Sequence, residues 1–345
     1  MRILYVGRDF SLIDDGGSVV ARRNYESLLQ LGVLADSLLI PPPSTIGRIK
    51  NFMFRESYGL TRKIRKHFMR LISNKYDFVF FDGSVYGGLL KCCFNNNIRT
   101  ICFYHNVEQV YYKEKYKVTK GFKDRWMIPY MTFNEMISTT YATALVTLNE
   151  RDSKVLKELY DRSADFVFPT SFEPINLSLA DYSDDDYLLF VGSNFFANVE
   201  ATNFILVNIA PFIKYKIVIA GNICESYIGK EIPENVVFAG RVDSLFKHYV
   251  NALAVIAPIF SGSGLKTKTV EALRYGKTVV GTDEAFQGIE FNEDIGFKCN
   301  TSEEFINVIN SAKFEKYNIG SHKLFDRRYS NVAQVNRLKV FLSSL

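Results

Sequence analysis

Residues 257–276 read APIFSGSGLKTKTVEALRYG, and this stretch decides the fold class of the chain. An apolar run ends here, a glycine loop follows, and apolar residues then recur at helical spacing from about Leu265. A buried strand that leads through a glycine loop into a helix is a unit of an α/β domain. Gly276 is a natural end for that helix, because glycine accepts the left-handed backbone that often follows a helix C-terminus.

The same alternation of short apolar runs and longer amphipathic stretches extends along nearly the whole chain. The runs that predict buried strands are Ile3–Val6, Phe78–Phe81, Thr100–Tyr104, Ala144–Leu148, Tyr187–Val191, Lys216–Ala220, Val236–Phe238, Ala254–Pro258 and Thr278–Gly281. Short buried strands separated by helices imply parallel sheets that are covered by helices on both faces.

The predicted strands fall into two groups, and 345 residues suffice for two domains. Between the groups lie Phe168–Pro174, with two prolines, and the acidic segment Asp181–Asp186. We read these acids as a linker rather than a metal motif, because no apolar strand leads into them at a glycine turn. The expected division is an N-terminal Rossmann-like acceptor domain over 1–175, a C-terminal Rossmann-like donor domain over 176–325, and a helix over 326–345 that packs back toward the N-terminal domain.

Composition describes a folded protein without a strong charge bias. Hydrophobic residues make up 47% of the chain and charged residues 23%, and the net charge of +5 permits an anionic partner without itself indicating nucleic acid. The five cysteines contain no C-x-x-C pair, so we expect reduced thiols of a cytosolic protein. No window approaches the ~18 apolar residues of a membrane span, and the N-terminus lacks a signal-peptide pattern. A cytoplasmic protein, soluble or peripheral to the membrane, is expected.

The glycine loop and the following helix have the chemistry of a phosphate site. Glycines let a phosphate approach the backbone closely, and the N-terminus of a helix favours negative charge. Lys266 and Lys268 point about 200° apart on a helix, whereas Lys268 and Glu271 share a face. The cation suits a diphosphate and the carboxylate suits ribose hydroxyls, although a surface helix with an ordinary Lys–Glu pair is the alternative. The P-loop and dinucleotide-binding glycine patterns are absent from the sequence.

Residues 262–273 also match, without a gap, the pattern Gly-Ser-Gly-x-Lys/Arg-x-Lys-x-x-Glu-Ala-Leu. This resembles the donor-binding motif of glycosyltransferases with the GT-B fold, in the glycogen-synthase-like group (family four, glycosyl transferases group 1) that includes bacterial mannosyl- and rhamnosyltransferases. Further segments that resemble the group in order and spacing are Leu189–Ser193, Asn198–Ala201, Val236–Asp243, Thr278–Thr282 and Gly288–Glu290.

The resemblance implies two Rossmann-like parallel-sheet domains that face each other across a cleft. It implies a transferase that moves a hexose-type sugar from a nucleotide-diphosphate sugar to a hydroxyl of a saccharide acceptor, lipid-linked in many bacterial members. Retention of the anomeric configuration, independence of metals and other cofactors, and a role in surface polysaccharide or lipopolysaccharide O-antigen synthesis follow from the same resemblance.

The resemblance also assigns site residues. His105 follows the strand Thr100–Tyr104, where a histidine is often catalytic in this group, and a loop histidine with a structural role is the alternative. We expect the catalytic residues to be His105, Lys268 and Glu271, and no metal site. The expected donor-binding residues are Gly16, Gly17, Gly192, Ser193, Asn198, Arg241, Gly262, Ser263, Gly264, Leu265 and Lys266.

The sequence departs from the group at two points. Ser263 stands where the group often has a first glutamate, with seven residues between it and Glu271. The loop after the first strand of the second domain offers Ser193 and Asn198 in place of an arginine and a lysine, so the positive charge must come from Lys266, Lys268 or Arg241. Two rivals therefore stay open: a noncatalytic GT-B partner or scaffold, and a GT-B nucleotide-sugar epimerase or hydrolase.

One stretch of the N-terminal half is strongly basic. Its cations are Arg48, Lys50, Arg55, Arg62, Lys63, Arg65, Lys66, Arg70 and Lys75, against the single acid Glu56. Apolar and aromatic residues are interleaved with them, which suits an anionic membrane surface at the inner face of the cell membrane. The alternative is a solvated helix with a buried apolar face. Binding of nucleic acid is not expected, because no module for it is recognisable.

Overall fold

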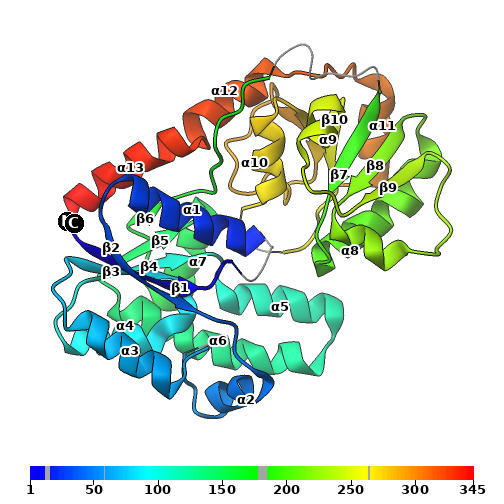
Figure 1. Ribbon diagram of the computed structural model, residues 1–345. Coiled ribbons are helices and arrows are strands. Elements are labelled where there is room, and N and C mark those ends of the chain that lie inside the picture. The colour runs from blue at the N-terminus through cyan, green and yellow to red at the C-terminus, as the bar shows by residue number, and fades with distance from the viewer. Residues whose placement is uncertain (12–15, 58, 178–184, 263–264) are drawn as a thin grey trace. The chain divides into compact units, whose positions relative to one another are not determined.

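The computed structural model describes residues 1–11, 16–57, 59–177, 185–262 and 265–345. It divides into two compact units, the first made of Met1–Thr170 with Gln334–Leu345 and the second of Ser171–Ala333. Each unit holds a six-stranded sheet, and the neighbouring strands of both sheets are parallel. The α/β class with parallel sheets is thereby confirmed (Figure 1).

The sheet of unit 1 has the strand order β2-β1-β3-β4-β5-β6. Its strands are β1 (Ile3–Arg8), β2 (Leu34–Ile40), β3 (Phe78–Asp82), β4 (Thr100–Tyr104), β5 (Ala144–Thr147) and β6 (Phe166–Val167). Every residue of β3, β4 and β5 is buried, as their unbroken apolar sequences predict. Because the strands are parallel, the polar residues that follow β1, β3 and β4 meet at one edge of this sheet.

Helices connect these strands and cover the sheet (Figure 1). They are α1 (Gly16–Gln30), α2 (Thr45–Met53), α3 (Arg62–Ile72), α4 (Gly87–Asn95), α5 (Glu108–Thr119), α6 (Phe122–Tyr141) and α7 (Glu150–Tyr160). Side-chain caps define several of their starts: Ser44 accepts from Gly47, Thr61 accepts from Ile64, and Asn149 accepts from Asp152. In the described residues no helix is long and apolar enough to span a membrane.

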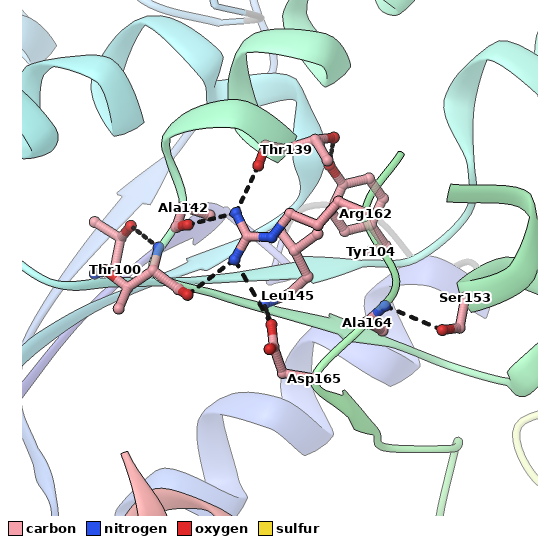
Figure 2. A network of polar contacts seen from close by, with 10 residues as sticks. Thr100, Tyr104, Thr139, Ala142, Leu145, Ser153, Arg162, Ala164 and Asp165 are labelled. Atoms are coloured by element: carbon pink, nitrogen blue, oxygen red, sulfur yellow. Dashed lines mark hydrogen bonds and ion pairs between the residues drawn. The ribbon is translucent and has the colours of Figure 1, made fainter. Parts of the chain in front are cut away.

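Arg162 fixes the end of α6 beside β4 and β5, as Figure 2 shows. Its guanidinium donates to the carbonyls of Thr139, Ala142 and Thr143 at 2.6–2.9 Å, which satisfies acceptors that the end of a helix leaves free. The carboxylate of Asp165 lies 3.7 Å from the same guanidinium. This brace therefore joins the end of α6 to the residue that precedes β5.

The sheet of unit 2 has the order β12-β11-β10-β7-β8-β9. Its strands are β7 (Tyr187–Val191), β8 (Lys216–Ala220), β9 (Val236–Gly240), β10 (Ala254–Ala257), β11 (Thr278–Gly281) and β12 (Gly296–Lys298). Its helices are α8 (Phe196–Phe204), α9 (Phe246–Asn251), α10 (Thr267–Arg274), α11 (Ser302–Ser311), α12 (Ile319–Arg328) and the start of α13 (Asn331–Ser344). Gly221 must be glycine, because its φ is +110° and a Cβ would lie 2.2 Å from the carbonyl oxygen of Gly192.

The unit boundaries differ by a few residues from the expected 175/176 and 325/326. Phe172 bridges to Ser330, and the side chain of Asn331 donates to Glu173 at 2.7 Å, so these segments belong to unit 2. Residues 334–345 belong to unit 1, where the ring of Phe341 stacks on a phenylalanine of β6 at a centroid distance of 4.6 Å.

Candidate functional site

The glycine loop that opens the predicted donor site follows β10. Gly262 has a φ of +112°, which favours glycine, while Ser263 and Gly264 lie outside the described residues. The helix α10 begins at Thr267, two residues after the expected start, because Leu265 is buried in the core and Lys266 has the extended backbone of an N-cap residue. The carbonyl of Lys266 accepts from the N–H groups of Thr269 and Val270 in the first turn of α10.

The ammonium of Lys268 lies against α8 and β7. It donates to Oδ1 of Asn198 and lies 4.6 Å from the ring centroid of Phe190. Asn198 in turn donates to the carbonyl of Ser193 at 2.9 Å, so two expected donor-binding residues and the expected catalytic Lys268 meet here. Burial of the ammonium, with a smaller contribution from Lys266, lowers the pKa of Lys268 to about 7, although part of its side chain remains exposed.

The ammonium of Lys266 has a different environment. It forms an ion pair with the carboxylate of Glu284 at 2.6 Å. Its charge is thereby balanced, whereas no carboxylate of the described residues forms an ion pair with Lys268. Glu284 was not predicted from the sequence, and the available signal was an acidic residue shortly after the end of β11.

Glu271 is held by an aromatic pair. The hydroxyl of Tyr249 donates to its Oε2 at 3.3 Å, and the rings of Tyr249 and Tyr275 stack with centroids 4.7 Å apart. Burial raises the pKa of Glu271, against the opposing effects of Arg274 and of this hydrogen bond. Lys268 and Glu271 therefore contact different neighbours. The alternative, in which the two side chains form an ordinary ion pair on a surface helix, requires a contact between them that they do not make.

The other expected donor-site residues of unit 2 lie at the ends of β7 and β9. Gly192 is buried in the turn after β7, where its N–H donates to Ala220 at 2.9 Å. Ser193 is exposed beside it. Arg241 is exposed directly after β9, beyond a glycine with a φ of +76°.

A second polar cluster lies in unit 1, where β3 ends at Asp82. The buried carboxylate of Asp82 accepts from the hydroxyl of Tyr5 and from the amide of Asn24, each at 2.6 Å. Nε2 of His105 lies 3.1 Å from the same carboxylate, at ion-pair distance but without the alignment of a hydrogen bond. Burial opposes the charge of Asp82, yet His105, Tyr5 and Asn24 outweigh it and lower the pKa of this carboxyl.

Two arginines border this cluster. Arg23 is buried, with its guanidinium 3.8 Å from the ring centroid of Phe168, and its Nε and Nη1 have no hydrogen-bond partner among the residues that the structure describes. Burial lowers the pKa of Arg23 to about 9, against the opposing charge of Asp82. Arg8, at the end of β1, donates to Ser18 in α1. The expected Gly16 and Gly17 are the first two residues of α1, so a helix N-terminus and two cations gather at this edge of the sheet.

The segment that carries His105 is held by a buried glutamate of α6. The carboxylate of Glu135 accepts from the backbone N–H of Glu108 at 2.8 Å and of Gln109 at 3.3 Å, which caps α5. The hydroxyl of Tyr160 also donates to it at 2.8 Å. Burial raises the pKa of Glu135 to about 7, although these hydrogen bonds oppose the shift. The sequence had not predicted this role.

Comparisons with known proteins place this geometry in context. Residues 185–312, within unit 2, match the family model described as glycosyl transferases group 1. The structure of Anabaena HepE in complex with UDP-glucose superposes with a TM-score of 0.71 at 12% identity over all of both chains. A glycosyltransferase from Rickettsia africae gives 0.65 at 14% identity, covering 99% of this chain and 97% of its own. TarM gives 0.56 at 14% identity, covering 76% of this chain and 54% of its own.

A comparison with curated protein sequences gave no significant match. At these identities the structural likeness establishes the fold. The chain therefore has the GT-B fold, and the part of it that contains Lys266, Lys268 and Glu271 matches the group 1 glycosyltransferase family.

Proposed function

We propose that this protein is a glycosyltransferase that moves a hexose-type sugar from a nucleotide-diphosphate sugar to a hydroxyl of a saccharide acceptor. The observation that carries the proposal is the position of Lys268. Its ammonium lies at the start of α10, held by an amide oxygen of Asn198, inside the segment that matches the glycosyltransferase family model. An ammonium without a carboxylate partner suits an anionic ligand.

The chemistry follows from the charge that develops on the leaving group. As the bond to the anomeric carbon breaks, the nucleoside diphosphate gains negative charge. Lys268 and the first N–H groups of α10 are fixed groups that stabilise such charge, and on this basis we propose a reaction that needs no metal. Glu271 is proposed to accept from ribose hydroxyls, and His105 is proposed as the catalytic contribution of unit 1.

The finer features of the proposal rest on the resemblance to the glycogen-synthase-like group of glycosyltransferases. They are retention of the anomeric configuration, a lipid-linked saccharide as acceptor, a role in surface polysaccharide or O-antigen synthesis, and work at the cytoplasmic face of the membrane. Solved structures of HepE contain UDP, UDP-glucose, and UDP with glucose. Uridine donors are therefore the first to test.

A thermal-shift screen of nucleotide sugars and free nucleoside diphosphates tests the proposal. A ligand that binds the folded state raises the melting temperature by mass action, so the screen identifies the base and then the sugar. Transfer from the stabilising donor to a saccharide acceptor is then measured by release of the nucleoside diphosphate. If no nucleotide stabilises the protein at millimolar concentration, a transferase is excluded.

A noncatalytic GT-B scaffold is the second candidate. The observation that favours it is the segment after β7, where Ser193 in the loop and Asn198 in α8 take the place of an arginine and a lysine, and where Asn198 already accepts from the ammonium of Lys268. A scaffold predicts no turnover with any donor. An epimerase or hydrolase predicts an epimerised donor or a free sugar in the absence of acceptor, and product analysis by NMR distinguishes the three.

A further inference from the structure

The structure divides the basic stretch 48–75 into two helices of opposite character. The helix α3 buries Phe68 and Ile72 in the core of unit 1 and directs most of its basic residues to solvent. It is therefore an ordinary surface helix, which was the alternative reading of this stretch. In α2 the pattern is reversed: the buried residue is the polar Asn51, and the apolar residues face solvent.

The exposed apolar side chains of α2 are continuous with those at the start of α6. The ring of Phe52 contacts Trp126 with centroids 6.1 Å apart, and Phe122 contacts Trp126 at 5.7 Å. Figure 1 shows α2 beside α6. We define the apolar patch as the large apolar side chains of α2, of the residue after it and of the start of α6 that are 50–74% exposed: Ile46, Ile49, Met53, Phe54, Phe122 and Trp126.

Exposed cations lie on the same segments, and we call them the basic rim. They are Arg48, Lys50 and Arg55, on α2 or just after it, and Lys120, Lys123 and Arg125, between α5 and α6 or in the first turn of α6. The nearby acids are already paired: Glu56 with Arg65 at 2.5 Å, and the buried Asp124 with Lys115 at 3.1 Å. The surface is therefore both apolar and positively charged.

We propose that the apolar patch and its basic rim dock this protein on an anionic lipid surface. Tryptophan and phenylalanine favour the boundary between headgroups and acyl chains, and lysine and arginine near that boundary bind lipid phosphates. Charge complementarity favours lipid phosphates as the partner, because six exposed cations accompany the patch and the acids Glu56 and Asp124 are each paired with a cation. An apolar patch of this kind is uncommon on a soluble monomer unless it binds something.

This inference rests on the proposed transfer to a lipid-linked acceptor, but its test needs no enzymatic activity. The chain has one tryptophan, Trp126, and it lies in the apolar patch. Vesicles of phosphatidylcholine with phosphatidylglycerol are expected to shift its emission to shorter wavelength, and lipids brominated near the headgroup are expected to quench it. Pure phosphatidylcholine vesicles are expected to bind less, and salt is expected to weaken binding to the anionic ones.

Exposed side chains of the patch provide variants that should fold normally. Met53→Ser with Phe54→Ser keeps Trp126 as the reporter and is expected to lower vesicle partitioning about tenfold or more, because two apolar side chains no longer enter the lipid. The matched control is Val207→Ser with Phe212→Ser, two exposed apolar residues of unit 2, for which partitioning should not change.

Three outcomes would overturn the proposal. They are no cosedimentation with anionic vesicles at low salt, cosedimentation without any change in Trp126 emission, and self-association through the patch, seen as a dimer in light scattering that Met53→Ser with Phe54→Ser dissociates. Calorimetry with the nucleoside diphosphate is run on the same samples. If the protein binds the nucleotide but not the vesicles, only the docking proposal is refuted. If it binds the vesicles but not the nucleotide, the proposed transferase function is refuted.

Discussion

The carboxyl ends of the two sheets hold their proposed site residues in different ways. In unit 1 the imidazole of His105 lies beside the buried carboxylate of Asp82, which also accepts from Tyr5 and Asn24. In unit 2 the ammonium of Lys268 contacts an amide oxygen and an aromatic ring. The carboxylate of unit 1 belongs to a buried polar cluster that the fold itself stabilises. No carboxylate of the described residues pairs with Lys268, so an anionic ligand would be the partner of its protonated form. The two sites should therefore respond differently to substitution.

The largest expected effect is on transfer in Lys268→Ala. Loss of this ammonium should lower kcat about 100-fold or more, as removal of a preorganised charge at a developing anion does. The free energy of unfolding should change by less than about 1 kcal/mol, because burial of the ammonium is itself unfavourable. The control Lys214→Ala, at an exposed position, should retain full turnover. Near-normal turnover by folded Lys268→Ala would remove Lys268 from the mechanism.

Asp82→Asn should instead affect folding and transfer together. The new amide would place a donor against Tyr5, Asn24 or His105, so the free energy of unfolding should fall by about 1–3 kcal/mol in urea denaturation. Because folding lowers the pKa of Asp82, its stabilising contribution is present above the unfolded pKa of about 3.9 and is lost as the pH falls through the folded value. Asp77→Asn, at the exposed residue that precedes the same strand, is the control. Equal effects of the two substitutions would contradict a special role of Asp82.

A moderate effect of pH should distinguish Lys268 from a surface lysine. Its pKa is about 7 in the free protein, and an anionic diphosphate should raise it, so binding takes up a proton above pH 7. Affinity for the nucleoside diphosphate should therefore fall as the pH rises above 7, by up to about tenfold per unit. Calorimetry in two buffers of different ionisation enthalpy measures the proton uptake. Lys268→Arg, which stays charged, should show none, and uptake that persists in this variant would assign the proton elsewhere.

The smallest expected effect concerns Lys266. Glu284→Gln removes the carboxylate that balances it, so nucleotide affinity should rise by a few-fold, on the order of 1 kcal/mol or less. A fall in affinity would show that Glu284 itself contacts the ligand. Titration of this variant and of wild type with the nucleoside diphosphate compares Lys266, which pairs with a carboxylate, with Lys268, which pairs with none in the described residues.

Nine of the twelve strands in the described residues could be predicted from the sequence, because unbroken apolar runs are a local signal, whereas β2, β6 and β12 were missed. The helix that follows the glycine loop after β10 was also predicted, and its role as a phosphate site stays a prediction. The position of Asp82 could not be predicted, because its partners Tyr5 and Asn24 are brought to it by the placement of β1 between β2 and β3. Glu135 was missed for the same reason, since it caps a helix through a contact between α6 and α5.

The neighbours of Lys268 also depend on tertiary structure. Helical spacing correctly places Glu271 one turn away, but the choice of partner is made by Asn198 from α8 and Tyr249 from α9. The stretch 48–75 is a second case in which the sequence alone does not predict which side chains are buried. Its composition is uniform, yet α3 buries its apolar residues and α2 exposes them, which only packing against the sheet decides.

The most direct test of the central claim is a calorimetric titration of the nucleoside diphosphate that stabilises the protein, carried out on wild type and Lys268→Ala at pH 7. A donor site built on Lys268 predicts binding to wild type and a loss of about tenfold or more in the variant, with an unchanged melting temperature. Equal affinities of the two proteins would contradict the assignment of the donor site.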